Sequence, residues 1–198
     1  MNALLSLMLV LAPLRTETGK FTIYQDGKKI GTEQFTITPR TGGYIVEGHT
    51  VITDASQKAD LKSHMELNDA LKPTLYQFDS TVGSIRLKID SPTSDFEYTI
   101  QGEKHSDDVR FPEDGVIIDT NFFHHYAILL YRIGAKPGST TIPAFAPQEL
   151  QLGPLTVRNL GNNIHEMDSG NLKVNATTDK EGRLIRLVVP DAKVVVER

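Results

Sequence analysis

The sequence predicts a mainly β protein, built as a single large curved antiparallel sheet or half-open barrel of about ten strands with one inserted helix at about 119–133. Most of the chain after residue 20 alternates apolar and polar residues in short runs, which is the period of a half-buried strand. Residues typical of turns separate these runs. A helical apolar period is convincing only in the segment 119–134.

The N-terminal residues form an apolar run that is too short to span a bilayer but has the length of a signal-peptide core. We therefore expect residues 1–16 to be a signal peptide or N-terminal apolar segment, and residues 17–198 to be a single antiparallel β domain. The alternative for this run is a core strand or helix. Export predicts a periplasmic or secreted location in a bacterial cell envelope.

The strands can be placed by their alternation and by the turns between them. Phe21 and Ile23 precede a hairpin turn at Asp26-Gly27, and Leu61 and Met65 share one parity against polar neighbours. A polar segment at 103–110 leads toward the helix. The expected strands lie near 21–23, 33–38, 44–53, 61–67, 76–82, 85–89, 96–100, 141–146, 155–159, 171–177, 183–189 and 193–197.

Composition excludes several classes of function. The net charge is −4 over 198 residues with both signs interspersed, so we expect no nucleic-acid partner. The chain contains no cysteine, which excludes a disulfide, a thiolate nucleophile and a cysteine-bound metal. We expect no metal and no cofactor, because the usual catalytic and phosphate-binding motifs are also missing from the sequence.

The helix carries the candidate functional residues. Asp119 or Thr120 can cap its first turn, and Gly134 supplies its end. A broad arc of the helix is apolar and is expected to face the sheet. The residues that we expect to line a ligand-binding surface are Asn121, Phe122, Phe123, His125 and Tyr126.

Two adjacent histidines, His124 and His125, leave a second interpretation open. They point about 100° apart on a helix, so they are poorly placed to chelate one ion together. A hydrolase could use either of them as a general base, oriented by Asp119 or by Glu166 from a loop at 162–166 that also carries His165. Both histidines can instead be structural, bonded to neighbouring groups where the helix meets the sheet.

Four motifs are spread over nearly the whole chain after the N-terminal segment. They are Phe21-x-Ile23-Tyr24-x-Asp26-Gly27-x-x-Ile30-Gly31, Asp119-x-Asn121-Phe122-x-His124-His125, Pro137-Gly138 before the run from Ile142 to Pro147, and Gly182-Arg183-Leu184-Ile185-x-Leu187-x-Val189-Pro190. Together these motifs resemble a family of uncharacterised bacterial exported proteins classed as a domain of unknown function. The layout is also distantly similar to the curved half-barrel proteins of the periplasm that carry lipoproteins. The family resemblance implies an envelope location and a fold but no activity.

The favoured hypothesis is a non-enzymatic envelope protein that binds a lipid, a lipoprotein or another hydrophobic ligand in the concave face of the sheet. A sheet of about ten strands tends to curl, and one helix leaves part of its concave face uncovered. Such a protein would associate with membranes transiently. The alternatives are the hydrolase described above and a structural or assembly role through an exposed strand edge, for which 194–196 is the candidate.

Overall fold

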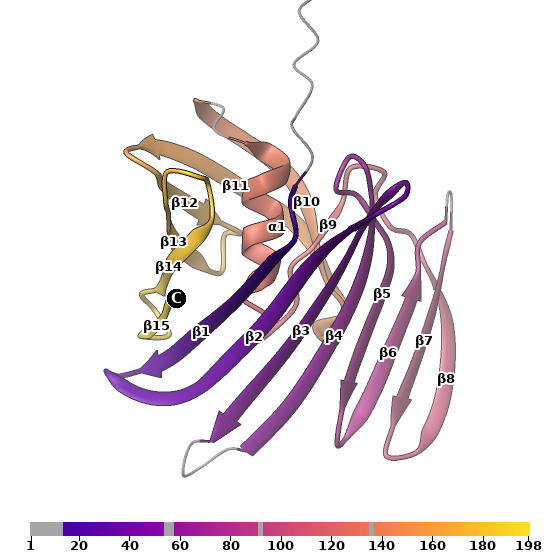
Figure 1. Ribbon diagram of the computed structural model, residues 1–198. Helices are drawn as coiled ribbons and strands as arrows, with labels where there is room; N and C mark the ends of the chain where they lie inside the picture. Colours follow the sequence, from indigo (N-terminus) through magenta and orange to yellow (C-terminus); the bar gives the residue numbers. More distant parts are fainter. Residues whose placement is uncertain (1–13, 54–57, 91–92, 135–136) are drawn as a thin grey trace, which may run out of the picture.

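A computed structural model describes residues 14–53, 58–90, 93–134 and 137–198 (Figure 1). These residues form one open sheet of 15 strands and one α-helix, α1 (His124–Ile133). The predicted class, a large open β sheet with one inserted helix, is therefore confirmed. Residues 1–13 of the predicted N-terminal segment lie outside the described residues. In the described part of the chain, no helix combines the length and apolar character needed to cross a bilayer.

The first half of the sheet is a meander in which each strand pairs antiparallel with the next. The long strands carry a regular alternation of buried and exposed residues, as the sequence predicts. The strands are β1 (Glu17–Gln25), β2 (Lys28–Arg40), β3 (Gly43–Thr53), β4 (Lys58–Asn68), β5 (Pro73–Ser80), β6 (Gly83–Lys88), β7 (Ser94–Ile100) and β8 (Glu103–Val109).

The second half also pairs antiparallel, with one exception. The short β9 pairs parallel with β10, and α1 connects these two strands in the sequence. A 3-10 turn, η1 (Pro147–Glu149), joins β10 to β11. The strands are β9 (Val116–Ile117), β10 (Gly138–Ala146), β11 (Gln151–Gly161), β12 (Ile164–Asp168), β13 (Lys173–Thr178), β14 (Leu184–Val189) and β15 (Val194–Glu197).

The two halves meet at β15, which pairs with β1 on one side and β14 on the other. The alternative in which 194–196 forms an exposed strand edge is therefore wrong, since Val196 is fully buried between Ile23 and Leu187 of the flanking strands. Figure 1 shows that the sheet curves, so that β1–β8 and β10–β15 form two walls with α1 between them. Phe96 of β7 and Phe145 of β10 touch across this interior, with ring centroids 6.4 Å apart.

The helix is shorter than predicted and begins at His124, not near residue 119. Asn121 has a φ of 65°, a left-handed conformation that a helix does not contain, so residues 120–123 form turns instead. Neither Asp119 nor Thr120 caps the helix, because its N-cap is Phe123, which has no capping side chain. The predicted end is confirmed, since Gly134 has a φ of 63° and donates its N–H to the carbonyl of Leu130.

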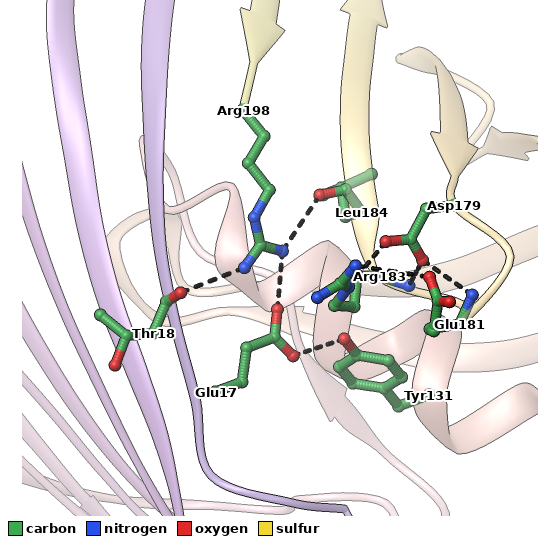
Figure 2. Close-up of polar contacts among 8 residues, drawn as sticks. All are labelled: Glu17, Thr18, Tyr131, Asp179, Glu181, Arg183, Leu184 and Arg198. Carbon is green, nitrogen blue, oxygen red and sulfur yellow. Dashed lines mark hydrogen bonds and ion pairs between the residues drawn. The ribbon is translucent and has the colours of Figure 1, made fainter.

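A polar cluster ties the last turn of α1 to both ends of the described chain (Figure 2). Glu17 of β1 accepts hydrogen bonds from the Tyr131 hydroxyl at 2.5 Å and from the Arg198 guanidinium at 2.7 Å. Arg198 also donates to the carbonyl of Thr18 at 3.2 Å. Burial and the neighbouring Glu17 carboxylate raise the pKa of Tyr131, so this hydroxyl stays protonated as a donor.

Candidate functional site

A cavity of about 450 Å³ lies beside the N-terminal part of α1 and is open to solvent on one side. Its volume falls in the range of small-molecule sites. One wall consists of the turn before the helix and its first residues, and the other consists of strands β10, β11, β13, β14 and β15. Apolar side chains dominate this wall, among them Leu155 of β11, Val174 of β13 and Leu172 in the turn before β13.

The structure brings together four of the five residues expected to bind a ligand. Asn121, Phe122, Phe123 and Tyr126 all line the cavity. His125 does not line it: its ring packs between those of Phe122 and Tyr76, at centroid distances of 5.4 and 5.7 Å.

Glu33 of β2 holds the start of α1 and is fully buried. Its carboxylate accepts the backbone N–H of Phe123 at 2.7 Å and that of His124 at 2.9 Å. It also lies 2.5 Å from Nδ1 of His124. A remote carboxylate thus satisfies first-turn N–H groups that a local N-cap side chain would ordinarily satisfy.

The ring of His124 fills a slot between strands β2, β3 and β4. Glu33 fixes Nδ1 as a donor, and Nε2 lies 3.4 Å from the hydroxyl of Ser63 on β4. Gly48 of β3 leaves room for the ring, because a Cβ at that position would lie 2.2 Å from Cε1 of His124. The ring also stacks on Phe35, with centroids 5.7 Å apart.

Ser63, His124 and Glu33 occur in the order of a nucleophile, a base and an orienting carboxylate. A nucleophile needs a substrate beside it. Ser63 is only 5% exposed, His124 and Glu33 are fully buried, and none of the three lines the cavity beside the start of α1. This arrangement therefore supports a structural role, which joins the helix to three strands.

Asp119 is buried beside the helix but does not orient either histidine through its carboxylate. Its oxygens accept the Tyr76 hydroxyl at 2.5 Å and the backbone N–H groups of Thr120 and Gln148 at 3.0 and 3.1 Å. The contact with His125 is made by the Asp119 backbone N–H, which donates to Nδ1 at 3.1 Å. Burial raises the pKa of Asp119.

His125 is a neutral histidine. Because its Nδ1 accepts a hydrogen bond, the proton of the neutral ring is on Nε2, which is buried without a hydrogen-bond partner among the described residues. Burial, and secondarily the neighbouring His124, lower the pKa of His125 well below its usual value.

Glu166 and His165 belong to strand β12, and the expectation of a loop at this place is wrong. Glu166 pairs with Arg158 of β11 at 2.5 Å. His165 lines a second cavity of about 550 Å³ beside the C-terminal end of α1, together with Tyr44 and Tyr131. The structure therefore does not bring Glu166 or His165 to the first turn of α1, where His124 and His125 lie.

Sequence reasoning missed Glu33, Ser63 and Tyr76. Glu33 carried a signal, because it shares the parity of Phe35 and Ile37 and so stands as a charged residue on the buried face of a strand. The other two had none, since serine and tyrosine are common on either face. Among the described residues, no three His, Asp or Glu side chains are grouped as a metal would require.

Comparison with known proteins identifies a solved structure with a similar fold. No protein-family model and no curated protein matches the chain. A solved structure of a DUF1089 family protein from Pseudomonas aeruginosa is similar, with a TM-score of 0.53 and 13% sequence identity over 81% of this chain and 90% of that one. At this identity the likeness concerns the fold alone. The chain thus resembles in fold a bacterial domain of unknown function, in keeping with the resemblance inferred from its motifs.

Proposed function

We propose that this protein is an exported envelope protein that binds a lipid, a lipoprotein or another hydrophobic ligand, and that it does so without catalysis. The observation that carries the proposal is the apolar cavity between α1 and the concave face of strands β10–β15. An exported carrier needs an apolar space that exists before the ligand arrives, with few polar groups to orient the ligand.

The helix wall of the cavity is packed against the sheet. Phe122 is almost fully buried, and its ring packs edge to face with Phe78 of β5 at 6.1 Å. Tyr126 contributes a hydroxyl that has no hydrogen-bond partner among the described residues. A ligand with an apolar body and one polar group would match this combination.

Exposed leucines around the cavity support a transient contact with a membrane or an acyl chain. Leu172 lines the cavity and is 37% exposed. Leu150 and Leu152 flank the lining residue Gln151 and are 57% and 49% exposed. Apolar side chains gathered beside a cavity lower the cost of moving a hydrophobic ligand into it from a lipid surface.

The test is to fill the cavity. Gly153 lines it, and a Cβ built there meets nothing within 4 Å, so Gly153→Leu adds volume at a position that is open around the Cβ. Protein purified from the envelope of its host should carry a lipid-sized mass in native mass spectrometry, and the variant should carry less of it. Added lipid extract should raise the Tm of the wild type but not that of Gly153→Leu, because a ligand stabilises only the state that binds it.

The matched control is Ser139→Leu, which adds the same side chain to an exposed part of β10 outside the cavity. We expect it to retain ligand as the wild type does. A wild type that carries no lipid and whose Tm does not respond to lipid extract would overturn the proposal. Export is tested separately: the protein should appear in the envelope fraction, with an N-terminus near residue 17 on N-terminal sequencing.

A further inference from the structure

We propose that the cavity beside α1 selects amphiphiles with a cationic head group over those with an anionic one, and that Glu149 at its mouth is the selecting residue. This inference rests on the proposed function, because it assigns a chemical class to the ligand of the same cavity. It concerns charge selectivity, which the apolar lining alone does not determine.

The charged residues that line the cavity have a single sign. Asp119 and Glu149 line it, and its described lining contains no Lys, Arg or His. Carriers of fatty acids and other anionic lipids need a basic or multiply donating group for the head, because a buried anion without partners is costly. This cavity offers carboxylates in that place.

The start of a helix would ordinarily attract an anion, because its free N–H groups and its dipole favour negative charge. In α1, acceptors within the protein already occupy these N–H groups. Glu33 accepts the N–H groups of Phe123 and His124. The next two N–H groups, those of His125 and Tyr126, donate to the carbonyls of Phe122 and Phe123 at 3.4 and 3.1 Å.

The two carboxylates have different roles. Asp119 is buried, with its oxygens engaged by Tyr76, Thr120 and Gln148, so it has little capacity left for a ligand. Glu149 is solvent-exposed and accepts one hydrogen bond, from the Thr120 hydroxyl at 2.6 Å. Its second oxygen can therefore face a head group at the mouth while the chain enters the cavity.

The negative charge of Glu149 is felt within the cavity. Burial and, secondarily, this carboxylate raise the pKa of Tyr126 to about 12. The Tyr126 hydroxyl therefore remains a neutral donor at physiological pH. A carboxylate or phosphate head would meet neutral donors and the repulsion of Glu149, whereas an ammonium head would meet a charged acceptor.

The experiment measures the affinities of decylamine, decanol and decanoate for the wild type and for Glu149→Gln, at concentrations that form no micelles. The amide oxygen of the variant can still accept the Thr120 hydroxyl, so the substitution changes charge with little change in shape. We expect it to weaken decylamine binding and to strengthen decanoate binding, each by roughly two- to fivefold as for an exposed charge, and to leave decanol unchanged. The control Glu103→Gln, on the exposed strand β8, should change none of the three.

The outcomes separate the inference from the proposed function. Effects of opposite sign on the amine and the carboxylate support the inference. Binding of all three amphiphiles with equal or no effect of Glu149→Gln would overturn charge selection and leave the hydrophobic site standing. Failure of all three to bind the wild type would contradict the proposed function, and the inference with it.

Discussion

Gly48 shows how the absence of a side chain determines the position of another residue. His124 occupies the space beside Gly48, where it reaches Glu33 and Ser63 on the two flanking strands. The backbone of Gly48 is not left-handed, so its value lies in the space that it leaves and not in conformational freedom. In the sequence, Gly48 looks like an ordinary strand residue. In the structure, its missing side chain is what allows the helix to pack against the sheet at His124.

Gly48→Ala should destabilise the protein by roughly 1–3 kcal/mol, because the new methyl group would lie 2.2 Å from the His124 ring and force it to move. Gly153→Ala is the matched control, since its Cβ would enter open space. Urea unfolding of both variants measures the difference. Equal free energies of unfolding for the two would show that the His124 slot is not tight.

His125 predicts a dependence of stability on pH. Its pKa lies well below 6.5 in the folded state, so the unfolded chain binds a proton first as the pH falls. Stability from this residue is fully present above pH 6.5 and is lost below it, by at most about 1.4 kcal/mol per pH unit. Asp119 has the opposite effect, because its pKa is raised from 3.8 and the folded state takes up that proton first.

The contribution of His125 is therefore measured as a difference between proteins. His125→Asn keeps an acceptor for the Asp119 N–H but cannot titrate. As the pH falls below 6.5, the free energy of unfolding of the wild type should decrease more steeply than that of the variant. Parallel curves would contradict the assignment of a neutral, buried His125, and His105→Asn on exposed β8 serves as the control.

Individual site residues were predictable only where a local pattern points to them. The aromatic run at Phe122 and Phe123 marked the cavity wall, because large apolar residues at the start of a helix need a surface to cover. The partner of His124 was not predictable. Glu33 lies 91 residues away in the sequence, and sequence patterns indicate contacts only between residues that are close along the chain.

At the scale of elements, α1 depends on the sheet for its beginning. A helix whose N-cap lacks a capping side chain would fray, and Glu33 of β2 prevents this from across the core. Its last turn depends on Glu17 and Arg198 through Tyr131 (Figure 2). Both ends of the helix are thus held by neighbouring strands, the first turn by β2 and the last turn by β1. Disruption of these two strands should therefore loosen both ends of the helix.

Glu33→Gln should lower the free energy of unfolding by roughly 1–3 kcal/mol, because a neutral amide replaces a charged acceptor of several buried donors. Glu33→Leu should cost roughly 3–5 kcal/mol, since it leaves those donors without a partner. Chemical denaturation measures both. Exposed Glu47→Gln on β3 is the control, and a Glu33→Leu variant as stable as the wild type would refute the capping role.

Among the elements, those with one buried face could be predicted. Three observed strands, β8, β9 and β12, are missing from the predicted set, and they lack a clear pattern for different reasons. β9 is only two residues long. β8 is exposed along nearly its whole length and so has no alternation to detect. β12 is short and follows the left-handed residues Asn162 and Asn163, which made the surrounding segment resemble a loop.

At the scale of the whole molecule, the open sheet has two edges that are protected differently. The β9 edge consists of two buried residues. The β8 edge is longer and exposed, and it carries Lys104, Asp107 and Asp108. Charged side chains on an edge strand hinder pairing with another copy, which keeps an unclosed sheet from extending.

Replacing Lys104, Ser106 and Asp108 together by Val should therefore promote self-association, because these residues share one face of β8. Light scattering coupled to size-exclusion chromatography measures the mass. The control replaces Lys104 by Gln and Asp108 by Asn, which removes the charges but keeps the strand polar. A triple variant that elutes as the wild type would show that strand shape, not charge, protects this edge.

The pairing of β1 with β15 also governs when the protein can finish folding. Most strands pair with a neighbour in sequence, so each half of the sheet can assemble through short loops soon after synthesis. The contact between the two halves instead joins Ile23 to Val196 and closes a loop of nearly the whole chain. This contact therefore cannot form until β15 has been synthesised, and until then the edges of β1 and β14 that it joins lack their partner strand.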